Sequence, residues 1–151
     1  MNPISLFTSV DGRVPRQTYW LGILAITVIG LPTIGLAAYL GGGTAGAIAN
    51  LFFLWCGFAL SAKRAQDRGK HYLFVAAYFG LLALLTNVSA SQSKMMGRMA
   101  AEPSPLLIVV SLLFIAYVIF LFIELGLRRG TVGPNRYGPD PLETAVASNS
   151  N

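Results

Sequence analysis

The sequence predicts an all-α, polytopic membrane protein in which four transmembrane helices pack as a small bundle. Hydrophobic residues make up 54% of its 151 residues and charged residues only 11%, whereas an ordinary soluble domain carries about 25% charge. Three long stretches contain no formal charge at all: residues 17–62, 72–93 and 103–123. A soluble globule with so few charges could not cover its surface with polar groups, and the same composition excludes intrinsic disorder.

The first uncharged stretch is long enough for two helices, because a helix crosses a hydrocarbon core of about 30 Å with roughly 20 apolar residues. The consecutive glycines Gly41, Gly42 and Gly43 are poor helix formers and predict the turn between the two helices. We therefore expect helices over residues 19–40 and 45–62. The first should be retained rather than cleaved as a signal peptide, because no Lys or Arg lies among the first 12 residues.

The other two uncharged stretches predict helices over residues 72–88 and 106–127. The last of these contains LLIVVSLLFIAYVIFLFI, which has no polar face to turn to water and therefore argues against a soluble helical bundle. Lipid offers the backbone no hydrogen-bonding partner, so each stretch should be helical despite its β-branched residues. We expect one integral membrane domain over residues 1–143 and a disordered tail over residues 144–151.

The distribution of positive charge predicts the orientation in the membrane. Nine of the 11 Lys and Arg residues fall before the first helix, between the second and third, or after the fourth, and only Lys94 and Arg98 fall on the opposite side. Positive residues favour the cytoplasmic side, so both termini should be cytoplasmic. The net charge of +5 therefore does not require a nucleic-acid partner, and a mildly basic face suits anionic lipid headgroups of the bilayer.

The sequence contains no recognisable catalytic or metal-binding constellation. Cys56 and His71 are its only cysteine and histidine, and one histidine without a cysteine does not make a metal site. No Ser/His/Asp grouping, Walker loop or HExxH motif is present. We therefore expect no enzyme activity, metal or cofactor. Glu124 stands four residues before Arg128, which predicts an ion pair at the cytoplasmic boundary of the fourth helix.

Three cytoplasmic segments carry the most specific choices of residue. They read DGRVPRQTYW (residues 11–20), KRAQDRGK (63–70) and GPNRYGPDP (133–141). The third holds three prolines and two glycines, which exclude a helix and fix a short series of turns. We expect this rigid segment to dock back onto the helices.

These segments resemble the bacterial inner-membrane family known as domain of unknown function 805. The resemblance rests on GR-x-x-R-x-x-YW before the first helix, a basic turn ending in Asp67, and NRYGPDP, and it extends from Gly12 to Pro141. The family's basic turn usually reads R-R-L-H-D, whereas this chain has KRAQD, with Gln66 in place of the histidine. The resemblance implies a four-helix inner-membrane protein, and it implies no reaction.

The charged residues of the three segments predict a cytoplasmic clasp, in which arginines interleave with carboxylates and tie both termini to the central segment. In the sharper interpretation the same residues bind a phosphate-bearing ligand or an anionic lipid headgroup, because arginine forks suit phosphate geometry. The candidate residues are Asp11, Arg13, Arg16, Arg64, Asp67, Asn135, Arg136, Tyr137 and Asp140.

Together these features predict a membrane component that binds a partner protein, lipid or a second copy of itself through its basic cytoplasmic face. One alternative is a small oligomeric transporter or channel, although the helices offer few polar residues to line a path: Thr27, Thr33, Asn50, Ser61 and Glu124. Another is an enzyme that acts on lipid with Asp67 as base, for which a second catalytic group is missing.

Overall fold

The structure is a computed structural model, and it describes residues 3–96 and 104–143. The predicted tail over residues 144–151 lies outside the described residues. All regular elements of the described part are helices, as predicted. In chain order they are α1 (Pro3–Thr8), α2 (Arg16–Asp67), α3 (Leu73–Met96), α4 (Pro105–Leu121) and the π-helix η1 (Phe122–Leu127).

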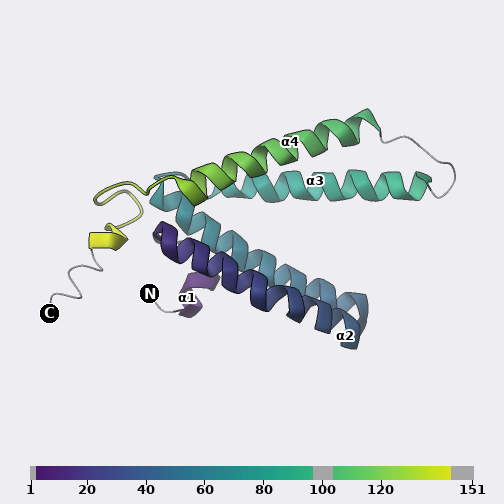
Figure 1. Cartoon of the computed structure of the whole chain (residues 1–151), viewed down its shortest axis with the longest axis horizontal. Helices are drawn as coiled ribbons and strands as arrows, with labels where there is room; N and C mark the ends of the chain where they lie inside the picture. Colours follow the sequence, from purple (N-terminus) through teal and green to yellow (C-terminus); the bar gives the residue numbers. More distant parts are fainter. Residues whose placement is uncertain (1–2, 97–103, 144–151) are drawn as a thin grey trace.

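Helix α2 is folded back on itself at the predicted glycine turn (Figure 1). Gly42 has φ 71° and ψ −174°, a conformation that residues with a Cβ rarely adopt. The two arms then pack closely: a Cβ added at Gly46 would lie 2.7 Å from the Ala38 Cβ, and one at Gly22 would lie 2.7 Å from Leu60 Cδ2. Small residues at these positions therefore allow the close approach of the arms.

Several predicted helix boundaries are wrong. The first arm of α2 begins at Arg16 rather than residue 19, and the second continues to Asp67, so residues 63–67 are helical rather than a basic loop. All five side chains from Lys63 to Asp67 are buried, and tertiary contacts therefore extend the helix past the point where the apolar run ends. Helix α3 continues beyond residue 88 to Met96.

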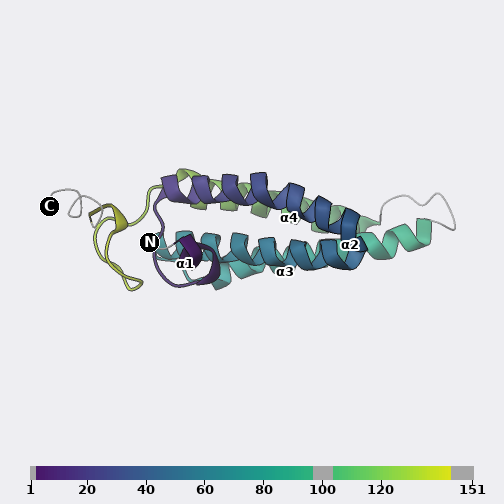
Figure 2. The same ribbon diagram turned by 90° about the horizontal axis from the view of Figure 1, so that it is seen from below.

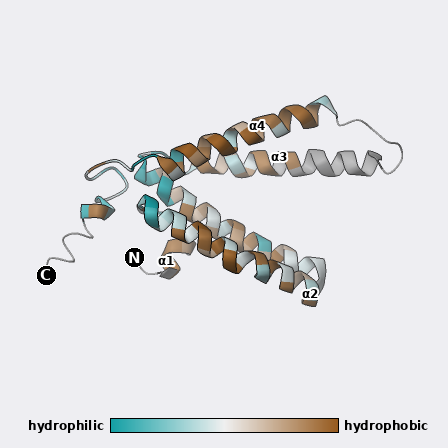
Figure 3. Ribbon diagram, viewed as in Figure 1, coloured by the Kyte–Doolittle hydropathy of each residue, from teal (hydrophilic) through white to brown (hydrophobic). Residues whose placement is uncertain are grey.

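Among the described residues, two helices are long and apolar enough to cross a membrane: α2, and the continuous helix Pro105–Leu127 formed by α4 and η1. Only 11% and 6% of their most apolar windows are buried within the protein. The core helix of a soluble protein would be mostly buried, so exposed apolar surface on this scale is consistent with a membrane protein. Figure 3 shows apolar residues along α4 and α2, and polar residues at the end where α2 starts and finishes.

The α2 hairpin and the pair of α3 and α4 meet at one end and diverge toward the other (Figure 1). In the perpendicular view the first arm of α2 lies level with α4 and the second level with α3 (Figure 2). Helices α3 and α4 pack through aromatic side chains, including Tyr78 and Phe114, whose ring centroids are 5.6 Å apart. A small core of Ala65, Val75 and Leu125 lies where the helices meet.

Lys63 fixes the short helix α1 against α2. Its side chain is fully buried, and Nζ donates to the carbonyl of Ser5 and to that of Leu6 at 3.1 Å. The ammonium group therefore binds carbonyls near the C-terminal end of α1, where a positive charge is favourable. Trp55 Nε1 also donates to the Thr8 carbonyl at 3.3 Å.

We expect Lys63→Met to release α1, because methionine keeps an apolar stem but has no N–H donor for the two carbonyls. Hydrogen exchange measured by mass spectrometry should become faster over residues 3–8 and stay unchanged in the first arm of α2. Lys70→Met is the matched control, because Lys70 pairs with Glu124 and does not contact α1 through its ammonium group. Equal exchange over residues 3–8 in wild type and Lys63→Met would contradict this role.

Candidate functional site

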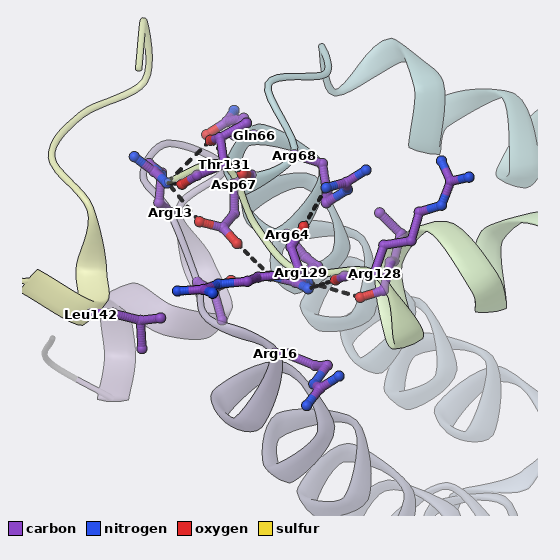
Figure 4. Close-up of polar contacts among 12 residues, drawn as sticks. Arg13, Arg16, Arg64, Gln66, Asp67, Arg68, Arg128, Arg129, Thr131 and Leu142 are labelled. Atoms are coloured by element: carbon purple, nitrogen blue, oxygen red, sulfur yellow. Dashed lines mark hydrogen bonds and ion pairs between the residues drawn. The ribbon is translucent and has the colours of Figure 1, made fainter. Parts of the chain in front are cut away.

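Asp67, the last residue of α2, lies at the centre of a cluster of buried charges (Figure 4). Its Oδ1 accepts a hydrogen bond from Arg13 Nε at 3.1 Å, and its Oδ2 accepts one from Arg64 Nη1. The three side chains are at most 4% exposed. Charges this deeply buried persist only when they are paired and hydrogen-bonded. We call Arg13, Arg64 and Asp67 the clasp.

Arg13 joins the N-terminal segment to the segment that follows η1, residues 128–143, which we call the tail from here on. Its Nη1 donates to the carbonyls of Gly133 at 2.7 Å and Gly138 at 3.2 Å, and its Nη2 donates to the Thr131 carbonyl at 2.6 Å. With the bonds to Asp67 and to Thr131 Oγ1, the guanidinium group makes five hydrogen bonds. That number equals its N–H donors, so Arg13 is saturated by the protein itself.

Arg64 joins α2 to the end of the fourth helix. Its Nε donates to the Leu125 carbonyl at 2.8 Å, and Nη2 donates to the Arg128 carbonyl at 2.5 Å. Its Nη1 also donates to the Val14 carbonyl at 3.3 Å. The final carbonyls of η1 lack helical partners, so one buried arginine satisfies them and holds the N-terminal segment beside them.

The tail caps the C-terminal end of α2. Both the backbone N–H and Oγ1 of Thr131 donate to the Asp67 carbonyl, at 2.8 and 2.9 Å. Asn135 Nδ2 donates to the Gln66 carbonyl at 3.1 Å. The Gln66 side chain accepts the Gly12 N–H at 3.0 Å through Oε1. This role requires an acceptor and no titratable group.

Asp140 shapes the tail through backbone hydrogen bonds. Its Oδ1 accepts the Leu142 N–H and its Oδ2 accepts the Gly133 N–H, both at 3.0 Å. The hydrogen bond from Leu142 is the main reason that the pKa of the Asp140 carboxyl lies below its ordinary value, and the one from Gly133 acts in the same direction. Asn135 and Gly138 close the turn between them by exchanging two backbone hydrogen bonds of 3.0 Å.

The structure brings together only part of the predicted clasp. The ion pairs given for the described residues join Asp67 to two arginines and Glu124 to three cations, and the predicted interleaving of arginines with Asp11 and Asp140 stays a prediction. Asp11 is exposed at the protein surface, whereas Asp140 is held by the backbone of the tail. The charges of Arg13 and Arg129 also lower the pKa of the Asp140 carboxyl.

The remaining predicted residues lie at the edge of the cluster. Arg16 is exposed and donates to the Leu127 carbonyl at 3.1 Å. Arg136 is also exposed, donates to the Gly69 carbonyl at 3.1 Å and lies 4.7 Å from the centroid of the Tyr137 ring. Within the described part of the chain, the buried hydroxyl of Tyr137 has no hydrogen-bond partner.

A second cluster surrounds Glu124, of which the sequence predicted one pair. Glu124 is 1% exposed and pairs with Arg128 at 2.8 Å, as the spacing predicted. Arg68 and Lys70 also pair with it, each at 3.3 Å. Both cations follow α2 in the chain, so only the folded structure places them beside η1. The position of Glu124 at the end of an apolar helix was the one sequence feature that indicated further cationic partners.

Two glycines missed by the sequence analysis allow close packing on α2, one in the tail and one in η1. A Cβ added at Gly130 would lie 2.0 Å from Asp67 Oδ2, and one at Gly126 would lie 2.6 Å from Trp20 Cζ2. Trp20 Nε1 also donates to the Gly126 carbonyl at 3.1 Å. Because only the tertiary contacts reveal these approaches, neither glycine stands out in the sequence.

Within the described residues, no group of three or more His, Cys, Asp or Glu side chains could hold a metal ion. No curated protein and no solved structure shows a significant match to the chain. The sequence profile described as "Protein of unknown function (DUF805)" matches residues 7–139, which include the clasp and most of the tail. The chain therefore belongs to the DUF805 family, a family of proteins of unknown function.

Proposed function

We propose that this protein is an integral component of the bacterial inner membrane that crosses the bilayer four times with both termini in the cytoplasm. Its role is structural or in binding rather than catalytic, and it acts through the basic face formed by the clasp and the tail. On this account the helices anchor the protein in lipid, and the folded cytoplasmic face meets the partner.

Helix lengths and charges support this topology. Each arm of α2 extends about 25 residues from the break at Gly42, or roughly 38 Å at 1.5 Å per residue, which suffices for a hydrocarbon core of about 30 Å. The break returns the chain to the side where it started. Nine of the 11 Lys and Arg residues belong to the segments on this side, which favours a cytoplasmic location.

The internal hydrogen bonds of Arg13 and Arg64 carry the proposal of a structural role. These arginines donate hydrogen bonds to Asp67 and to carbonyls of η1 and the tail. A phosphate group at the clasp would have to replace these buried bonds and leave carbonyls unpaired, which is costly. The clasp therefore fits a device that holds the ends of the chain and the helices in register.

Reporter fusions test the topology. Green fluorescent protein fused before residue 3 or after residue 143 should fluoresce, and alkaline phosphatase at either position should be inactive, because its disulfides form in the periplasm. Alkaline phosphatase inserted within residues 97–103 should be active. Termini found in different compartments, or extraction of the untagged protein by a carbonate wash, would contradict the proposal.

A further inference from the structure

A pocket of about 340 Å³ opens beside the clasp. One wall is the start of α2, with Arg16, and the opposite wall is the tail, with Arg129, Val132 and Leu142. Arg64 and Asp67 form part of its lining. In Figure 4, Arg16 and Leu142 lie below the Asp67 carboxylate. The volume is within the range of small-molecule sites and suits a small polar headgroup.

The charges around the pocket do not cancel. The lining holds three arginines, Arg16, Arg64 and Arg129, and the two carboxylates of Asp67 and Asp140. Arg64 and both carboxylates are buried, whereas Arg16 and Arg129 are exposed. The lining therefore carries an excess of one positive charge, which favours an anion.

These two arginines also have hydrogen-bond donors to spare. Arg16 makes one side-chain hydrogen bond, to the Leu127 carbonyl, and so retains most of its five N–H groups. Within the described part of the chain, the guanidinium group of Arg129 makes no hydrogen bond, and its charge acts on the Asp140 carboxylate. Arginine presents its donors in a planar fork that matches the oxygens of a phosphate group. Unlike the clasp arginines, this pair can bind a phosphate with the loss of at most one internal hydrogen bond, the one from Arg16 to the Leu127 carbonyl.

Apolar side chains at the rim indicate where the phosphate comes from. Val132 and Leu142 line the pocket and are 72% and 48% exposed. Trp20, one turn after Arg16, is 38% exposed and belongs to the residue type that prefers the headgroup level of a membrane. Exposed apolar residues beside spare arginines suit a ligand with a phosphate and an apolar portion better than a free ion.

We propose that this pocket binds the phosphate group of an anionic phospholipid. The forks of Arg16 and Arg129 bind the phosphate oxygens, and Val132 and Leu142 pack against the glycerol and upper acyl region. The proposal rests on the topology proposed above, since the lipid reaches the pocket from the cytoplasmic leaflet. It goes beyond the clasp, because residues outside the clasp bind the lipid, and Arg13, Arg64 and Asp67 only hold the surrounding segments in place.

The test compares the full chain with Arg16→Gln/Arg129→Gln in nanodiscs of phosphatidylcholine alone or with a fraction of phosphatidylglycerol. After gentle extraction, native mass spectrometry counts the lipids that stay bound. The wild type should retain phosphatidylglycerol in preference to phosphatidylcholine, and the double variant should retain at least about tenfold less, given the strength of charged hydrogen bonds. Arg16→Lys/Arg129→Lys keeps the charges and should retain part of the preference.

Arg136→Gln is the matched control, because Arg136 is an exposed arginine of the same tail that does not line the pocket, and its lipid retention should equal that of the wild type. Equal losses in Arg136→Gln and in the double variant would overturn the proposal, as would unchanged retention in the double variant. Displacement of the lipid by millimolar inorganic phosphate would overturn the assignment to a lipid. Size-exclusion profiles establish that each variant is folded, and the reporter fusions test the topology independently.

Discussion

Asp67→Asn is expected to destabilise the protein by about 3–5 kcal/mol, the cost of breaking a buried ion pair by removing one partner. Asparagine has the shape of aspartate but no charge, so it leaves the guanidinium groups of Arg13 and Arg64 buried without their carboxylate. The tail should then loosen as well, because Arg13 also holds the carbonyls of Thr131 and Gly133. The expected result in cells is a clear drop in membrane abundance.

Reversible unfolding in mixed micelles measures the free energy of unfolding for each variant. Asp11→Asn is the matched control, because Asp11 is exposed and surface substitutions usually change stability by less than about 0.5 kcal/mol. A free energy for Asp67→Asn that is equal to that of the control would show that the clasp contributes little to stability.

Gly130→Ala should destabilise the protein by about 1–3 kcal/mol or more, in the range of overpacking substitutions. The new Cβ would lie 2.0 Å from Oδ2 and 2.7 Å from Cγ of Asp67. A flexible side chain could move away, but the Asp67 carboxylate is held by two arginines. Either the clasp or the tail must therefore shift.

Gly57→Ala provides the control for this substitution. Gly57 lies inside α2 and a Cβ there meets no atom within 4 Å, so alanine should be neutral or slightly stabilising through its higher helix propensity. Thermal unfolding of both variants, followed by size-exclusion chromatography, checks the difference. If both variants unfold at the wild-type temperature, the close packing of the tail on Asp67 is wrong.

Composition and charge spacing sufficed for the class of the fold. The apolar run of α4 has no polar face, and the three glycines mark the turn that the backbone makes at Gly42. The end of α2 could not be predicted in this way. The charged residues from Lys63 to Asp67 look like a loop in sequence, and they are helical because distant carbonyls and carboxylates satisfy their side chains.

For the clasp, too, the sequence indicates which residues take part but not how they pair. The identity of Arg13, Arg64 and Asp67 followed from charged residues within rigid, specific segments, and the i,i+3 spacing of Arg64 and Asp67 favours their pairing. Which carboxylates pair with arginines could not be derived, because it depends on burial. Asp67 and Glu124 are buried beside cations, whereas Asp11 remains in water. The contact of Gly130 depends on the path of the tail, which no local pattern specifies.

Hydrogen exchange of the wild-type protein in nanodiscs tests the joining of the chain ends most directly. The backbone N–H groups of Gly12, Thr131 and Gly133 donate to Gln66 Oε1, the Asp67 carbonyl and Asp140 Oδ2. If the clasp ties both ends of the chain to α2, peptides covering residues 11–14 and 131–138 should exchange as slowly as the ends of the adjacent helices. Exchange of these peptides at the rate of an unstructured chain would contradict the clasp.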